Sequence, residues 1–182
     1  DIAQCLVGSE MCIRDRVMVM ICMTRVDFRM IHGQVASVWI PHYSATKVVI
    51  IDDTTSKDTF VQQILTFAAP KGTSVEFYNV EDGVAKYKEN QFGNGKIIVI
   101  FRSIEQAYKA YMQGFEFESI NVGQTPRESD QVHATATVYV SKEDLEHLKE
   151  LDQKGVYVYF RQEISKPEVQ LDSVVKKIGD KF

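Results

Sequence analysis

The stretch VMVMICMTRVDFRMIHGQV, residues 17–35, joins an apolar run to a cluster of charged and polar side chains. Residues 17–24 are Val, Met, Ile, Cys and Thr only, a composition that favours a buried β-strand. His32 follows Arg25 and Arg29 and stands at a predicted helix start. The loop between a strand and a helix of a parallel sheet lies at the carboxyl edge of the strands, where such folds bind ligands. The stretch therefore predicts a strand, a loop and a helix that present one imidazole at that edge.

Further strands and helices alternate along the rest of the chain. Short runs rich in β-branched and aromatic residues predict strands over residues 47–51, 74–78, 96–101, 119–122, 134–140 and 156–160. Apolar residues at helical spacing predict a helix between residues 53 and 71. Capping boxes at Ser103 and Ser141 predict two more helices, and Ser165 is expected to start a last one. This alternation is typical of one α/β domain, residues 17–182, with a mostly parallel sheet covered by helices on both faces.

Composition excludes several classes of protein. The chain is 45% hydrophobic and 25% charged, with a net charge of −4 and no basic stripe, which argues against a nucleic-acid binder. No run of about 18 apolar residues predicts a membrane span, so a soluble, cytoplasmic protein is expected. No His, Cys or carboxylate spacing suggests a metal site, and neither a metal nor a cofactor is predicted.

The first residues do not fit a natural protein start. The segment CLVGSEMCIRDR, residues 5–16, resembles a translated sequencing adapter, and we exclude residues 1–16 as a non-native leader. A signal peptide is the alternative, but charged residues interrupt any apolar core. A native start at Met18 or Met20 would place the His32 motif almost at the N-terminus.

Residues 25–35 match, position for position, the pattern R-[IV]-D-x-R-[LM]-[IL]-H-G-Q-V. The chain thereby resembles the IIB components of the mannose/fructose/sorbose class of the bacterial phosphoenolpyruvate-dependent sugar phosphotransferase system (PTS). Residues 48–53, 68–70 and 121–123 continue the resemblance, which covers about residues 20 to 175. It implies a mostly parallel sheet with helices on both faces and one antiparallel edge strand. At the variable position of the pattern this chain has Phe28, where many members have a second acid.

The chemistry of the motif supports a phosphate site. Neutral imidazole is a nucleophile toward phosphorus near pH 7, so His32 is predicted to carry a phosphoryl group. Arg29 and Arg25 are predicted to bind phosphate oxygens through their guanidinium forks, although Arg25 has an alternative role as a structural partner of Asp27. Backbone amides of Gly33 and Gln34 are predicted to point at the phosphate. Asp27 is expected to orient a guanidinium or the imidazole.

Other polar residues are predicted to lie near the same edge with less specific roles. Asp52 and Asp53 follow a strand, and capping of the next helix is favoured over contact with substrate. Arg127 is expected as an exposed turn residue or a phosphate or partner contact, and His133 is a minor candidate for lining the site. His42 and His147 are not predicted to take part, and His147 is expected to be solvated.

The resemblance implies a protein-N(pi)-phosphohistidine–sugar phosphotransferase, IIB component. His32 would accept phosphate from a IIA phosphodonor protein and pass it to a sugar during uptake through a IIC/IID membrane carrier, at the inner face of the membrane. The sequence does not distinguish among mannose, fructose, sorbose and amino sugars as the substrate. It also does not show whether the protein forms a homo-oligomer. The alternative is a non-catalytic regulatory or anion-binding module with the same fold. A nucleotide-binding Rossmann domain is disfavoured because no glycine fingerprint follows the first strand.

Overall fold

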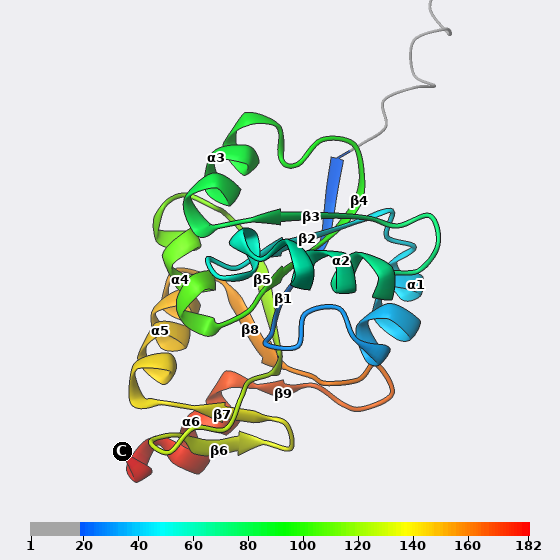
Figure 1. Ribbon diagram of the computed structural model, residues 1–182. Helices are drawn as coiled ribbons and strands as arrows, with labels where there is room; N and C mark the ends of the chain where they lie inside the picture. The colour runs from blue at the N-terminus through cyan, green and yellow to red at the C-terminus, as the bar shows by residue number, and fades with distance from the viewer. Residues whose placement is uncertain (1–18) are drawn as a thin grey trace, which may run out of the picture.

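A seven-stranded sheet forms the centre of the protein in the computed structural model, which describes residues 19–182 (Figure 1). The strand order is β3-β2-β4-β1-β5-β8-β9. The strands are β1 (Val19–Asp27), β2 (Lys47–Ile51), β3 (Ser74–Tyr78), β4 (Gly95–Phe101), β5 (Ser119–Gln124), β8 (Tyr157–Phe160) and β9 (Val169–Gln170). All neighbours pair in parallel except β8 and β9, so β9 is the antiparallel edge strand. The predicted fold class is confirmed, whereas the predicted leader lies outside the described residues.

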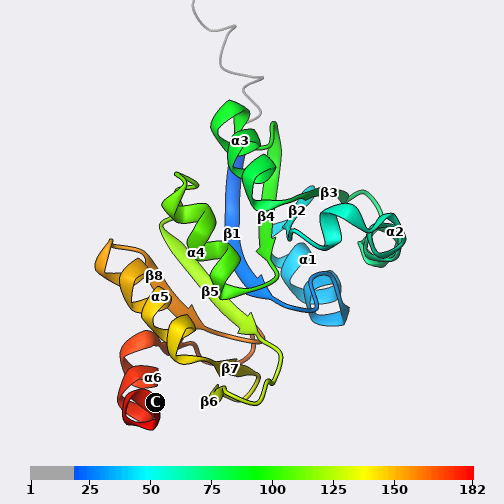
Figure 2. The same ribbon diagram turned by 60° about the vertical axis from the view of Figure 1, so that its left-hand side comes forward.

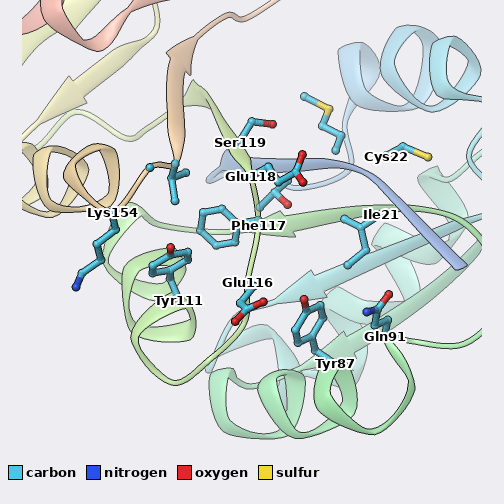
Figure 3. A pocket seen from close by; sticks show the side chains of 14 residues that line it. Ile21, Cys22, Tyr87, Gln91, Tyr111, Glu116, Phe117, Glu118, Ser119 and Lys154 are labelled. Atoms are coloured by element: carbon cyan, nitrogen blue, oxygen red, sulfur yellow. The ribbon is translucent and has the colours of Figure 1, made fainter.

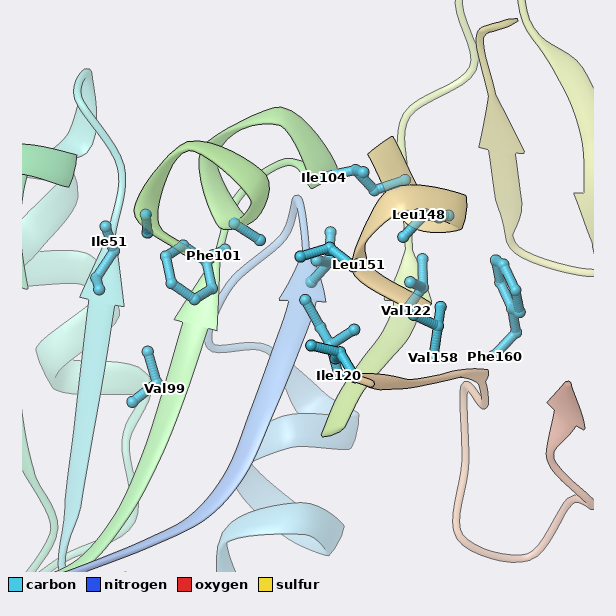
Figure 4. Packing of buried hydrophobic residues seen from close by; sticks show 14 of the residues in the cluster. Ile51, Val99, Phe101, Ile104, Ile120, Val122, Leu148, Leu151, Val158 and Phe160 are labelled. Atoms are coloured by element: carbon cyan, nitrogen blue, oxygen red, sulfur yellow. The ribbon is translucent and has the colours of Figure 1, made fainter. Parts of the chain in front are cut away.

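Helices cover both faces of the sheet (Figure 2). They are the π-helix η1 (Val35–Trp39), α1 (Ile40–Tyr43), the 3-10 turn η2 (Thr55–Lys57), α2 (Thr59–Ala68), α3 (Val80–Asn90), α4 (Ile104–Met112), α5 (Lys142–Gln153), α6 (Leu171–Ile178) and the 3-10 turn η3 (Gly179–Lys181). On one face, Ile104 of α4 and Leu148 of α5 belong to one buried apolar cluster with Phe101 of β4 and Val122 of β5 (Figure 4). On the other face, Trp39 of η1 and Leu65 of α2 pack over the strands in a second apolar cluster. The hydrophobic effect thus holds the sheet from both sides.

Side-chain caps fix where several helices begin. Asp58 accepts hydrogen bonds from two backbone N–H groups of α2, and Ser141 with Asp144 forms the predicted capping box of α5. Ser103 caps α4 as predicted, but its box is incomplete. The side chain of Gln106, which should return to the Ser103 backbone, donates to Asp52 instead. The box would need Gln106 Oε1 to accept from the Ser103 N–H, whereas the bond from Gln106 Nε2 to the Asp52 carboxylate is charge-assisted and about twice as strong as a neutral one.

Three parts of the predicted secondary structure are wrong. The single strand predicted over 134–140 is a hairpin of β6 (Val132–Thr135) and β7 (Val138–Val140), which pair in a separate antiparallel sheet. The last helix begins at Leu171 rather than at Ser165, because the intervening residues cross the end of the sheet and form β9. Helix α3 was not predicted, since few of its side chains are buried and the apolar periodicity is weak.

Candidate active site

The loop with His32 leaves the carboxyl end of β1, in the middle of the sheet between β4 and β5. It is anchored at its start by the Phe28 N–H, which donates to the carbonyl of Gln124 on β5 at 3.1 Å. The chain then turns sharply, because the Met30 N–H donates to the Asp27 carbonyl at 3.0 Å and Met30 adopts a left-handed conformation with φ of 56°. That conformation costs a residue with a Cβ roughly 1–2 kcal/mol. Burial of the Met30 side chain offsets the cost, and the turn brings His32 back to the end of β1.

Asp27 is the centre of the hydrogen-bond network at this loop. Its side chain is fully buried, and Oδ2 accepts from Arg25 at 2.8 and 3.1 Å and lies 3.1 Å from Nε2 of His32. Oδ1 accepts from the backbone N–H of Arg29 at 3.1 Å. A carboxylate only accepts hydrogen bonds, so Nε2 of His32 carries the hydrogen and Nδ1 carries the lone pair. The structure thus contains both of the contacts expected of Asp27, one to a guanidinium and one to the imidazole.

The imidazole of His32 is mostly covered, with 11% of the side chain exposed. Its Nδ1 has no hydrogen-bond partner within residues 19–182, yet it is not among the atoms hidden from solvent. The nitrogen that bears the lone pair is therefore the one that an incoming group can reach. An imidazole held in one tautomer, with its free nitrogen at the surface, can act as a nucleophile.

Arg25 is buried at the other side of Asp27, with 1% of the side chain exposed. Its five N–H groups all donate within the protein: two to Asp27, one to Asn121 Oδ1, and one each to the carbonyls of Arg161 (3.0 Å) and Gln162 (3.4 Å). Burial lowers the pKa of Arg25, and the charge of Asp27 opposes that shift. The geometry favours the structural pairing with Asp27 over direct binding of phosphate by Arg25.

Two further residues complete the surroundings of this buried guanidinium. A Cβ at Gly123 would overlap the guanidinium group of Arg25, so only glycine fits beside it on β5. The indole ring of Trp39 lies on another side, with its centroid 5.2 Å from the Arg25 Cζ, a cation–π contact. Trp39 itself is buried in the core. The sequence identified Asn121 and Gly123 only as part of the family resemblance. Their position near the end of a predicted strand could have indicated a polar role.

Arg29 and Gly33 lie at the surface of the loop. Apart from its two chain neighbours and the backbone of its own helix, no atom of the described chain lies within 4 Å of the position that a Cβ on Gly33 would take. The Ala36 N–H donates to the His32 carbonyl at 2.8 Å, so helical hydrogen bonding starts at His32. The first amides of a helix have no intrahelical partner, which leaves those of Gly33 and Gln34 for a ligand. The space around the Gly33 Cβ position is open to an anion, and binding of phosphate by the amides of Gly33 and Gln34 stays a prediction.

Asp52 and Asp53 have structural partners, but neither caps the next helix, α2, whose N-cap is Asp58. Asp52 is buried and accepts from the N–H and hydroxyl of Thr55, the first residue of η2, at 2.7 and 2.6 Å. Burial acts to raise the pKa of Asp52, but hydrogen bonds from Thr55, Gln106 and Arg102 outweigh it and hold the pKa below its usual value. Asp53 accepts from the N–H of Val80 at 2.9 Å, at the start of α3.

The remaining candidates lie on the hairpin and on other helices. Arg127 is exposed and stacks over the ring of Tyr139 at 5.7 Å, and His133 lies 5.1 Å from the same ring. Within residues 19–182, neither side chain makes a hydrogen bond, ion pair or aromatic contact with the His32 loop. His42 is exposed in the last turn of α1. The expectation for His147 is wrong, because its ring is mostly buried and stacks on Tyr108 of α4 at 4.0 Å.

A recess of about 680 Å³ lies away from the His32 loop (Figure 3). It is lined by residues at the amino ends of β1 and β5, such as Ile21 and Ser119, and by Tyr87 and Tyr111. Residues 19–182 contain no group of three His, Cys, Asp or Glu side chains placed to hold a metal ion. In the same part of the chain, no helix has both the length and the apolar character needed to cross a bilayer.

Solved structures share this architecture. The IIB domain of the sorbose permease from Klebsiella pneumoniae superimposes with a TM-score of 0.80 at 28% identity, over 86% of this chain and 97% of that one. The N-acetylgalactosamine-specific IIB component 1 from Escherichia coli gives a TM-score of 0.77 at 26% identity, over 82% and 98% of the two chains. The fold is therefore that of the IIB components of sugar phosphotransferase systems.

The sequence comparisons identify the family within the IIB components to which the chain belongs. The chain belongs to the family described as the PTS system sorbose subfamily IIB component, whose sequence model matches residues 21–181. The sorbose-specific EIIB component of K. pneumoniae is 28% identical over 151 residues, 83% of this chain and 92% of that protein. The mannose-specific EIIAB component of E. coli is 24% identical over 156 residues, and this chain spans only 48% of its length.

Proposed function

We propose that this protein is a phosphocarrier that takes a phosphoryl group onto Nδ1 of His32 and transfers it to a sugar. The observation that carries the proposal is the hydrogen bond between Nε2 of His32 and Asp27 at 3.1 Å. It leaves Nδ1 with the lone pair at the surface of the loop, and family membership supplies the class of reaction. The proposed activity is that of a protein-N(pi)-phosphohistidine–sugar phosphotransferase, IIB component.

The first transfer breaks the P–N bond of a phosphohistidine on the donor and forms a bond from phosphorus to Nδ1 of His32. The ring keeps its hydrogen on Nε2 and gains positive charge, which the carboxylate of Asp27 stabilises. In the second transfer a sugar hydroxyl oxygen attacks phosphorus, the bond to Nδ1 breaks, and the released lone pair accepts the hydroxyl proton. No cofactor or metal enters either step.

The other motif residues divide into two roles. Arg29 is exposed beside His32 and is proposed to bind the phosphoryl oxygens, together with the amides of Gly33 and Gln34. Arg25 is proposed as a positioning residue, because its guanidinium holds Asp27 and Asp27 holds the imidazole. Arg127, His133, Asp52 and Asp53 have no assigned contact with the phosphoryl group in this proposal.

The proposed partners follow from the chemistry of a surface phosphohistidine. A IIA protein donates the phosphoryl group, and a IIC/IID membrane carrier presents the sugar at the cytoplasmic face. Relatives named for sorbose, mannose and N-acetylgalactosamine support a hexose or amino sugar as the acceptor. We also propose that the protein works in the cytoplasm, where it would meet both the IIA donor and the cytoplasmic face of the carrier.

The test is transfer of a radioactive phosphoryl group from a phosphorylated IIA protein to the purified chain. We expect an acid-labile label on the wild-type protein and on a His133→Ala control, and none on His32→Ala. A labelled His32→Ala protein would overturn the assignment. A wild-type protein that binds the phosphorylated donor but never takes the label would support the alternative, a regulatory or anion-binding module.

A further inference from the structure

A phosphoryl group on His32 would meet less positive charge in this structure than the two arginines of the motif, Arg25 and Arg29, suggest. Phosphoryl transfer spreads negative charge over three oxygens, and cations that face those oxygens stabilise the transition state. All five N–H groups of Arg25 are used by protein acceptors, which leaves Arg29 as the cation of the motif with an exposed side chain. A second guanidinium near His32 would therefore have to come from another element.

Strand β4 brings such a group to the same edge. In the pairing of β1 with β4, Val26 lies beside Phe101, and the residues that follow them are Asp27 and Arg102. Neighbouring strands are about 4.8 Å apart, so the backbone of Arg102 leaves the sheet next to that of Asp27. Asp27 in turn contacts the imidazole of His32. The backbone of Arg102 thus lies one strand away from that of Asp27, whose carboxylate contacts the imidazole.

A second set of contacts joins Arg102 to the His32 loop from its other side. Nη1 of Arg102 lies 3.3 Å from Oδ2 of Asp52, and the same oxygen accepts from the hydroxyl of Thr55. That hydroxyl is also 3.6 Å from the sulfur of Met30, the residue that turns the loop toward His32. The guanidinium of Arg102 is therefore held at the rim of the loop.

The contact of Arg102 with Asp52 leaves most of the guanidinium available. Asp52 already accepts three shorter hydrogen bonds, two from Thr55 and one from Gln106 at 2.8 Å. The side chain of Arg102 is 43% exposed, and within residues 19–182 its Nε and Nη2 groups have no hydrogen-bond partner. A guanidinium tethered by one long bond can change rotamer to meet an anion, because Thr55 and Gln106 still donate hydrogen bonds to the buried Asp52.

We propose that Arg102 is a second phosphate-binding residue, which contacts the phosphoryl group on His32 together with Arg29. This inference rests on the proposed function of His32. Arg102 then supplies the charge expected from Arg25 in the motif, while Arg25 holds Asp27 from within the core.

The test compares Arg102→Gln and Arg102→Lys with Lys109→Gln, a control that removes an equal charge from the exposed surface of α4. Phosphorylated IIA protein serves as donor in single-turnover measurements at saturating concentration. We expect Arg102→Gln to slow transfer roughly tenfold to a hundredfold, Arg102→Lys to recover part of the rate, and Lys109→Gln to match the wild type.

A spectroscopic measurement separates direct contact from structural support. A guanidinium near the phosphoryl oxygens favours their dianionic form, so the ³¹P titration midpoint of phosphorylated His32 should move to higher pH in Arg102→Gln. Wild-type rates and an unchanged midpoint in Arg102→Gln would overturn the inference while leaving His32 as the carrier. Slower transfer with an unchanged midpoint would also overturn it, by showing a structural role only. Absence of phosphorylation in the wild-type chain would instead refute the proposed function.

Discussion

A single carboxylate determines the state of the histidine in this fold. Asp27 sits at the end of a central strand with no exposed surface, and it contacts both Arg25 and His32. Burying a charge is costly unless it is paired and hydrogen-bonded, and the guanidinium of Arg25 supplies both at 2.8 Å. The buried pair therefore gives His32 a fixed partner, which solvent-exposed ions would not provide.

Gly33 offers a test of the phosphate site that does not disturb the fold. Apart from its chain neighbours and the backbone of its own helix, no atom of the described chain lies within 4 Å of a Cβ built at Gly33, so Gly33→Ala should change the free energy of unfolding by less than about 1 kcal/mol. If a phosphoryl group occupies that space, the new methyl group should slow transfer onto His32. Urea unfolding and transfer kinetics measure the two effects.

The matched control is Gly123→Ala, whose Cβ would overlap the guanidinium of Arg25. This variant should lose stability by roughly 1–3 kcal/mol, because the buried ion pair must shift. A Gly33→Ala protein with normal stability and normal transfer would show that the space beside Gly33 is not used by the phosphoryl group.

At the scale of elements, Asp52 ties together the end of β2, the turn η2 and helix α4. Its hydrogen bonds to Thr55, Gln106 and Arg102 come from three different segments. The same residue holds the turn that touches Met30 in the His32 loop. Asp52 thus links the packing of α4 to the conformation of the loop.

The lowered pKa of Asp52 predicts how stability depends on pH. The folded pKa is below the unfolded value of about 3.9, so the contribution is complete above that value and is lost as pH falls through the folded pKa. Asp52→Asn should therefore be less stable than the wild type at pH 7, and the difference should shrink below about pH 4. Urea unfolding between pH 7 and pH 3 measures it, with Asp152→Asn as an exposed control. A difference that stays constant over this range would refute the assignment.

For the whole molecule, the sequence predicted the parallel core and the location of the motif. Strands β2 and β3 have the predicted bounds, because buried parallel strands are continuous apolar runs that local composition reveals. The hairpin of β6 and β7 was missed, since its turn at Ala136 and Thr137 contains no glycine or proline. Local patterns do not report a turn that tertiary contacts stabilise.

The site could be predicted only in part for the same reason. His32, Arg29 and Gly33 are close in sequence, so a local motif describes them. The hydrogen-bond acceptors that surround Arg25 come from β5 and from residues 161–162, which are far away in the sequence. A local motif therefore could not show that Arg25 is buried. Arg102 lies at the same edge of the sheet as His32 because β4 pairs with β1. The sequence alone does not give the strand order, so it could not predict this proximity.

The most direct test of the central claim is to identify the phosphorylated atom by NMR. Wild-type protein with ¹⁵N-labelled histidine would be phosphorylated by a IIA donor, and phosphorus–nitrogen couplings would be recorded. The account predicts one phosphoramidate on His32, with phosphorus bonded to Nδ1 and hydrogen retained on Nε2. Phosphorus bonded to Nε2 of His32, or to any other residue, would contradict it.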